Sequence, residues 1–484
     1  MPIRLAIPYR GNTINFLRGS MPTMADSLFN SPKLTELISD LKNEVILAQK
    51  KITAVKPPHP ELIMNYQSYI EKIQGLRGRN LFYPYVGSGL GQGPYVELQD
   101  GSVKIDLING IGIHLFGHSH PDLIEASIRG ALQDIVMQGN LEPNREYGEL
   151  LEILVTAAGK KSRLKKGWIG TCGTIVNENA LKMARQKNSP ARKILAMKDN
   201  FAGRSTMMAE ITDNPEYRVG LPNYNEVLYL PYFDAKDPAS IDKTVQILKK
   251  HISENPKNIA CFIFELLQGE GGFNLAPPEF FKPLFEICRA HKIAVWADEV
   301  QTFSRTGELF AFETLGLGEY IDLVTIAKTA QCGAVLFTDE YNPKPGLIAG
   351  TFTASTVSLA AGIQTLKTLI NGIDGEPVFG ASGRIQKIHK KFTAMLSSLQ
   401  LGSCKSLIKD FGGLGLMIAM TPYDGSKERV MKLLQTLFKN GIVAFSCGHS
   451  PYKVRFLLPL ILEDRHIEEV KNILEKSLLE NAGA

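Results

Sequence analysis

Four short, largely apolar runs in the middle of this 484-residue chain constrain its fold more than any other feature. They cover residues 194–197, 259–264, 293–296 and 323–326, and stretches of helical character separate them. Runs that are apolar at successive positions are typical of strands buried on both faces. Such strands, alternating with helices, form mainly parallel sheets that helices cover. We therefore predict an α/β fold built on a mainly parallel sheet.

The length of the chain exceeds the size at which one hydrophobic core stops growing, so we expect more than one domain. The glycine-rich segment 87–93 lacks a preceding strand and a following helix, which argues against a dinucleotide-binding loop. The runs 95–98 and 103–108 instead predict a β-hairpin. After residue 372 a second α/β lobe begins. We predict an N-terminal extension (1–30), an N-terminal segment that packs with the small domain (31–119), a large cofactor-binding domain (120–372) and a C-terminal small domain (373–484).

Composition argues against several classes of function. A charged content of 21% and a net charge of +5, without a basic stripe, do not predict binding to nucleic acid. Six cysteines without CxxC spacing indicate reduced thiols and no metal site. No apolar run reaches the roughly 20 residues of a membrane span. We expect a cytoplasmic protein, although the acid-free residues 1–24 leave an organelle presequence open beside a plain extension.

A carboxylate and a lysine each follow one of the predicted strands. Asp298 comes after the run 295–297, and Lys328 comes after the run 323–327. Since the carboxyl ends of parallel strands meet at the ligand-binding edge of a sheet, we expect the two side chains to lie there. Pyridoxal phosphate (PLP) needs such a pair, because a lysine holds its aldehyde as a Schiff base and an acid keeps its ring nitrogen protonated. Taken alone, the pair also fits a helix-capping acid and a surface lysine.

Other segments offer groups that a phosphorylated ring and its substrates would need. Backbone N–H groups before a helix suit a phosphate, an aromatic side chain suits the ring face, and arginines suit carboxylates. These segments are 170–174, 201–204, 265–272, 350–353 and the predicted strand 453–458. Each also has an ordinary alternative, such as a helix cap, loop packing or a strand arginine that faces solvent.

In this order along the chain, the segments resemble class III aminotransferases, from about residue 75 to the C-terminus. Four motifs carry the resemblance: GHSHP at 117–121, QGEGG at 268–272, DEVQT at 298–302 and RTGELFAFE at 305–313. The chain looks closest to the 4-aminobutyrate and L-lysine 6-aminotransferase branch. That likeness lies in CGTIVNENA at 172–180 and KTAQCG at 328–333.

The resemblance implies a PLP-dependent transferase of fold type I, with a mainly parallel seven-stranded sheet in the large domain and a smaller α/β domain. It implies that Lys328 forms the Schiff base and moves a proton during catalysis, while Asp298 pairs with the pyridinium nitrogen. The other implied cofactor contacts are Gly173 and Thr174 at the phosphate, Val300 and Phe201 on the ring faces, Gln301 at the ring hydroxyl, and the partner subunit's Thr351. The active unit should therefore be a homodimer with its sites at the subunit interface.

The implied substrate contacts are Arg204 for the distal carboxylate of the donor, Arg455 for the α-carboxylate of 2-oxoglutarate or glutamate, Glu270 for neutralising Arg455, and Ile111 in the pocket wall. We expect ping-pong transfer from an ω-amino acid of the 4-aminobutyrate, lysine or ornithine type to 2-oxoglutarate, without a metal. Departures from the family pattern at Ile175, Ala202 and 353–355 leave the donor open. The alternatives are an aminomutase or epimerase on the same fold and, further off, a non-catalytic binding protein.

Overall fold

The computed structural model describes residues 21–134 and 141–482. Most of the N-terminal extension expected over residues 1–30 lies outside these ranges. So does most of the segment 1–24, for which a presequence was an alternative. The described part of the extension holds helix α1 (Met24–Phe29), where the Thr23 hydroxyl accepts a hydrogen bond from the main-chain N–H of Asp26 at 3.1 Å. Helices α2 (Pro32–Gln49) and α3 (Ile63–Arg77) follow.

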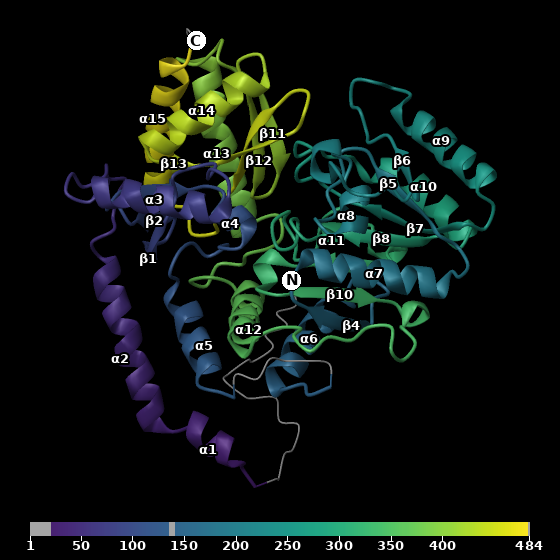
Figure 1. Ribbon diagram of the computed structural model, residues 1–484, viewed down its shortest axis with the longest axis horizontal. Helices are drawn as coiled ribbons and strands as arrows, with labels where there is room; N and C mark the ends of the chain where they lie inside the picture. Colours follow the sequence, from purple (N-terminus) through teal and green to yellow (C-terminus); the bar gives the residue numbers. More distant parts are fainter. Residues whose placement is uncertain (1–20, 135–140, 483–484) are drawn as a thin grey trace, which may run out of the picture.

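A seven-stranded sheet forms the centre of the larger lobe (Figure 1), in the order β4-β10-β9-β8-β7-β5-β6. Its strands are β4 (Lys166–Gly170), β5 (Lys193–Met197), β6 (Val227–Leu230), β7 (Ile259–Phe264), β8 (Ala294–Asp298), β9 (Leu323–Ile326) and β10 (Gly333–Phe337). Neighbouring strands from β9 to β6 are parallel, and β10 runs antiparallel to both β4 and β9. The prediction of an α/β fold with a mainly parallel seven-stranded sheet is confirmed.

Both faces of this sheet are buried, because successive side chains of a strand point into two different apolar cores. In β7, Phe262 and Phe264 lie in one core, and Cys261 and Ile263 lie in the other. Helix α10 (Pro278–Ala290) belongs to the first core and helix α7 (Gly173–Lys187) to the second. This two-sided burial explains why the strands are apolar at successive positions.

Further helices complete the larger lobe, and α12 packs against both α5 and α6. They are α5 (Pro121–Ala131), α6 (Arg145–Ala158), α8 (Thr206–Ile211), α9 (Ser240–Glu254), α11 (Ala311–Thr314) and α12 (Thr356–Asn371). A short 3₁₀ turn, Lys328–Ala330, lies between β9 and β10. Within 21–134 and 141–482, no helix combines the length and the apolar character needed to cross a bilayer.

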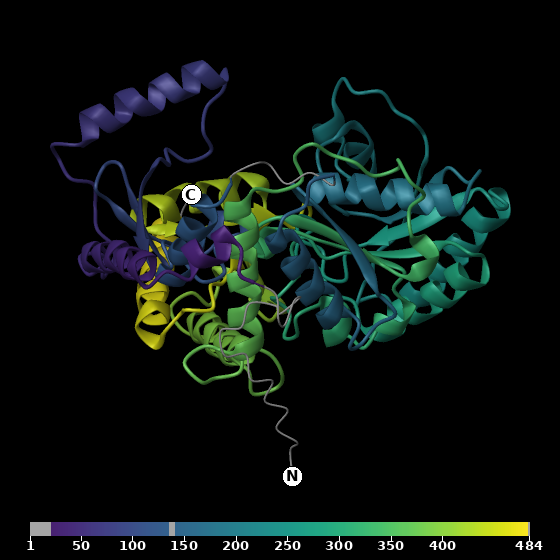
Figure 2. The ribbon, with the colours of Figure 1, turned by 90° about the horizontal axis from the view of Figure 1, so that it is seen from below.

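Two four-stranded sheets form the second lobe, where segments from both halves of the chain meet (Figures 1 and 2). One is β1 (Gly87–Gln92), β2 (Tyr95–Leu98), β3 (Val103–Asp106) and β13 (Ile442–Val443); the other is β11 (Ile408–Leu414), β12 (Met417–Pro422), β15 (Lys453–Leu457) and β14 (Phe445–Cys447). The expected hairpin is formed by β2 and β3, and the glycine-rich segment before it is strand β1. Because β13 pairs with β3, residues far apart in sequence share one sheet. The limits of the domains stay a prediction.

The helices of this lobe are α4 (Asn109–Gly112), α13 (Arg384–Leu401), α14 (Lys427–Asn440) and α15 (Asp464–Glu480). Helix α13 packs against α15 and β11, and α14 packs against α15 and β13. The short α4 contacts β15, so a segment from the first quarter of the chain lies beside the strand that carries Arg455.

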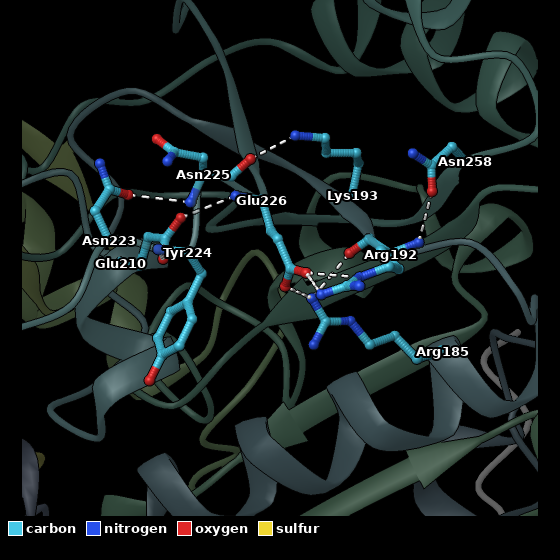
Figure 3. A network of polar contacts seen from close by, with 9 residues as sticks. All are labelled: Arg185, Arg192, Lys193, Glu210, Asn223, Tyr224, Asn225, Glu226 and Asn258. Atoms are coloured by element: carbon cyan, nitrogen blue, oxygen red, sulfur yellow. Dashed lines mark hydrogen bonds and ion pairs between the residues drawn. The ribbon is translucent and has the colours of Figure 1, made fainter.

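An ion-pair network joins the residues at the amino ends of β5 and β6 (Figure 3). Asp298 and Lys328 lie at the carboxyl ends of strands in the same sheet, so the network lies at the opposite edge. The buried carboxylate of Glu226 accepts hydrogen bonds from Arg185 at 2.5 Å and from Arg192 at 2.7 and 2.9 Å. Burial acts to raise the pKa of Glu226, but the two arginines outweigh it and hold that pKa below its usual value. The network therefore stabilises the fold far from the ligand-binding edge.

Candidate active site

The carboxyl ends of β7, β8 and β9 open into a cavity of about 360 Å³. Its wall contains all the residues that we predicted to hold the cofactor, except Thr351: Gly173, Thr174, Phe201, Asp298, Val300, Gln301 and Lys328. Asp298 and Lys328 meet there because they end neighbouring parallel strands.

The amino end of helix α7 forms one side of the cavity. Its N-cap residue, Cys172, makes no side-chain cap, so the first N–H groups of the helix are available to an anion. A Cβ at Gly203, which has a φ of +134°, would lie 2.5 Å from the Thr174 hydroxyl, and a Cβ at Gly173 would lie 2.8 Å from Val300. These glycines let the loops approach closely enough to form a small anion cradle.

Asp298 lies on the cavity wall and is only 4% exposed. One carboxylate oxygen accepts a hydrogen bond from the main-chain N–H of Val300 at 2.9 Å, and the other accepts one from the Asn177 amide at 2.7 Å. Burial raises the pKa of Asp298 to about 6, while these donors and the charge of Lys328 act in the opposite direction. The carboxylate is thus oriented and able to hold a cationic ring nitrogen.

Lys328 begins the turn after β9, with a left-handed backbone (φ +53°) that few non-glycine residues adopt. Burial lowers the pKa of its amine to about 8, and the positive charges of Arg455 and Arg305 add to this effect. Glu270 and Asp298 oppose it. A larger fraction of this amine than of an ordinary lysine is therefore neutral and nucleophilic near neutral pH.

Several residues of the wall had no role assigned from the sequence, among them Asn177, Glu265 and Ile113. Asn177 lies one helical turn after Gly173, so helical spacing alone could have identified it. Glu265 follows β7 as Asp298 ends β8, and it accepts hydrogen bonds from the N–H groups of Phe201 and Gly269, both at 2.9 Å. Burial, with the nearby Asp298 charge, raises the pKa of Glu265 to about 8. Ile113 reaches the cavity through a contact that no sequence signal predicted.

An ion pair joins the cavity to the second lobe. Arg455, on β15 and 3% exposed, donates a hydrogen bond to Glu270 at 2.6 Å, and Glu270 lies in the cavity wall. Burial acts to lower the pKa of Arg455, but the charge of Glu270 outweighs it and raises that pKa. Two nitrogens of Arg455, Nε and Nη1, have no hydrogen-bond partner among the described residues. Arg455 therefore pairs with Glu270 and still has two nitrogens that can donate hydrogen bonds to a ligand.

Two predicted substrate residues, Arg204 and Ile111, and the predicted cofactor residue Thr351 lie outside this cavity wall. The guanidinium of Arg204 stacks over the Tyr217 ring. Its central carbon lies 3.6 Å from the centre of that ring and 5.8 Å from the centre of the Phe201 ring. Ile111 lines a second cavity of about 490 Å³, beside the paired His118 and Asp106. Thr351 is exposed in the loop before α12. Within the single chain, the structure does not bring these three to Lys328.

Comparison with known proteins identifies the family. Residues 84–478 match the family model described as aminotransferase class-III. The chain belongs to the class III aminotransferases. It is 30% identical over 402 residues to a 2-aminoadipate transaminase of Pseudomonas putida, covering 79% of this chain and 92% of that one. It is 29% identical over 412 residues to a probable 4-aminobutyrate aminotransferase of Bacillus subtilis, covering 80% and 92%.

A lysine aminotransferase from M. tuberculosis has the same fold, with a TM-score of 0.75 at 20% identity over 85% of this chain and 99% of that chain. Class III aminotransferases are PLP-dependent enzymes, so the cofactor inferred from the sequence is confirmed. The curated relatives, which include the probable 4-aminobutyrate aminotransferase, are also consistent with the branch named from the sequence.

The residues of the cavity fit PLP. The buried amide oxygen of Gln301 has no partner among the described residues, as expected for a group that meets a ligand. The cradle at Gly173 and Gly203 would be filled by a Cβ. Asp298 supplies a buried carboxylate, and Lys328 supplies an amine, on the same wall. Across residues 21–134 and 141–482, no group of three or more His, Cys, Asp or Glu side chains is arranged to hold a metal ion.

Proposed function

We propose that this aminotransferase moves an amino group from an ω-amino acid of the 4-aminobutyrate, lysine or ornithine type to 2-oxoglutarate, in a ping-pong reaction. The observation that carries the proposal is the ion pair between Arg455 and Glu270 at 2.6 Å. An arginine with spare donors binds the α-carboxylate of 2-oxoglutarate or glutamate once Glu270 moves aside. While Glu270 neutralises Arg455, an amino donor that has no carboxylate at this position can bind without leaving the arginine charge unpaired.

The cofactor supplies an aldehyde that amines attack and a ring that accepts electrons. Lys328 would hold the cofactor through its neutral Nζ, and, once displaced, the same atom would accept a proton from the substrate carbon and return it to the cofactor side. Asp298 holds the proton on the ring nitrogen through a charged hydrogen bond. The N–H groups of Gly173 and Thr174 hold the phosphate at the helix terminus.

The remaining residues orient the ring and the donor. Phe201 and Val300 would cover the two ring faces, and Gln301 would bind the ring hydroxyl. Arg204 binds the distal carboxylate of the donor after leaving its stacked position on Tyr217. Ile111 closes the pocket wall in the assembled enzyme.

We also propose that the active unit is a homodimer in which the partner subunit's Thr351 reaches the phosphate. The exposure of the loop that carries Thr351 supports this, because the loop is free to contact another subunit. A cytoplasmic location stays a prediction from the sequence.

A panel of amino donors mixed with 2-oxoglutarate tests the proposed reaction, with glutamate measured as product. Glutamate should form from at least one ω-amino acid with wild-type protein and from none with Lys328→Ala. Absorbance of the bound cofactor should change on adding donor alone, as a ping-pong sequence requires. An isomerised donor with no glutamate formed would replace the proposal with an aminomutase or epimerase.

A further inference from the structure

Arg305 joins three segments that surround the cavity. Its Nη1 donates to the Thr329 hydroxyl at 2.6 Å, immediately after Lys328 in the chain, and to the carbonyl of Gln301 at 3.4 Å. Its Nη2 donates to the carbonyl of Gly112. A Cβ at Gly112, whose φ is +91°, would lie 3.3 Å from the guanidinium carbon, so glycine permits this approach. One side chain thus connects the lysine turn, the cofactor loop and the α4 segment.

The main chain of Arg305 is also tied to the second lobe. Its carbonyl accepts a hydrogen bond from the N–H of Leu416 at 2.9 Å. A Cβ at Gly415 would lie only 2.0 Å from that same carbonyl oxygen, and Gly415 has a φ of +60°. The two lobes therefore meet at the backbone of Arg305, while its side chain reaches toward Lys328.

Arg305 is a buried cation. It is 1% exposed, and within the described residues no carboxylate forms an ion pair with it. Its partners are carbonyl groups and one hydroxyl, which orient the guanidinium but leave its charge in place. Burying an uncompensated charge is unfavourable, so a neutral side chain would suit a purely structural role better.

We propose that Arg305 is a positioning residue for Lys328: it holds the lysine turn against the cofactor loop and keeps an unpaired positive charge beside the amine. The inference rests on the proposed role of Lys328. Because Arg305 lies outside the cavity wall, it acts through Thr329 and through its electric field, without touching the substrate.

Electrostatics near the amine agree with this geometry. Burial is the main cause of the lowered pKa of Lys328, and Arg455 and Arg305 lower it further. The acids that act on the amine in the opposite direction are Glu270, Asp298 and Glu265. Arg455 is neutralised by Glu270 at 2.6 Å, whereas Arg305 forms no ion pair with an acid in the part of the chain that the structure describes. When Glu270 and Arg455 are paired, the positive charge of Arg305 therefore still acts on the Lys328 amine.

The test measures the ionisation of Lys328 directly, in full-length protein freed of PLP. Acetylation of Lys328 by acetic anhydride is followed by mass spectrometry from pH 6 to 11. Arg305→Gln should raise the pH midpoint of labelling by about one unit, the usual size of a single nearby-charge effect. Arg305→Lys keeps the charge and should stay near the wild-type midpoint, while its dissociation constant for PLP rises several-fold. Arg384→Gln, at an arginine that also donates to a carbonyl but lies elsewhere, is the control.

Unchanged midpoints in all variants, with PLP still protecting Lys328 from acetylation, would overturn the inference and leave the proposed function standing. A wild-type Lys328 that PLP does not protect would instead overturn the proposed function. If Arg305→Gln does not fold, Thr329→Val removes one acceptor and keeps the charge. That variant should weaken PLP binding at an unchanged midpoint, and wild-type affinity would refute the positioning role.

Discussion

Replacing Glu270 by Gln separates the two halves of the proposed reaction. The substitution keeps the shape of the side chain and removes the negative charge that faces Arg455 at 2.6 Å. A hydrogen bond between charged groups contributes about 1.5–3 kcal/mol. Because Glu270 is 28% exposed, solvent screens part of this, and we take about 1–2 kcal/mol as the effective strength of the pair.

In the proposed reaction of the wild type, the α-carboxylate of 2-oxoglutarate or glutamate reaches Arg455 only after Glu270 is displaced. Glu270→Gln removes that cost, so the apparent affinity for glutamate should rise by about 5- to 30-fold, which corresponds to 1–2 kcal/mol. The ω-amino donor meets an unneutralised, buried arginine instead, so its apparent affinity should fall by a similar factor. The two half-reactions change in opposite directions.

Single half-turnovers of the bound cofactor, followed by absorbance, measure each half-reaction alone. Glu279→Gln is the matched control, because Glu279 is an exposed acid in the first turn of α10 and does not line the cavity. The reasoning is refuted if Glu270→Gln weakens both half-reactions equally, since that pattern indicates a damaged site and not a switch.

Three further predictions concern the cradle, the ring acid and the fold. Gly203→Ala places a Cβ 2.5 Å from a threonine hydroxyl at a φ of +134°, so PLP should bind about 10-fold weaker or worse, whereas Gly220→Ala, in open space at positive φ, should not change binding. Capture of PLP by cofactor-free protein should decline as the pH falls through about 6, where Asp298 becomes protonated; a flat profile from pH 5 to 8 would contradict this. Glu226→Gln should lower the melting temperature at pH 7 by several degrees, unlike the exposed Glu254→Gln. Because the folded pKa of Glu226 is depressed, this difference should shrink as acid protonates the carboxylate, from about pH 4.3 downward.

The strands that the sequence did not reveal differ physically from those it did. β4 and β6 lie at the two edges of the sheet and are only partly buried, so they lack the continuous apolar run that identifies a central strand. β10 is fully buried, but it follows β9 after a single 3₁₀ turn. A parallel sheet requires a longer crossover between strands, so an antiparallel partner directly after Lys328 does not follow from the pattern of alternating helices and strands.

Site residues at the ends of strands could be predicted from the sequence pattern, whereas contacts between loops could not. Asp298 and Lys328 could be predicted together because strand direction and order determine where strand ends meet. Arg305 could not, since its side-chain contact with Gly112 joins residues 193 positions apart and depends on two irregular loops. Loop contacts of this kind add to the effect of burial on the ionisation of Lys328. The residues at the strand ends, which indicate the type of chemistry, can therefore be predicted from the sequence. The loop contacts cannot, because the sequence pattern does not determine the paths of the loops.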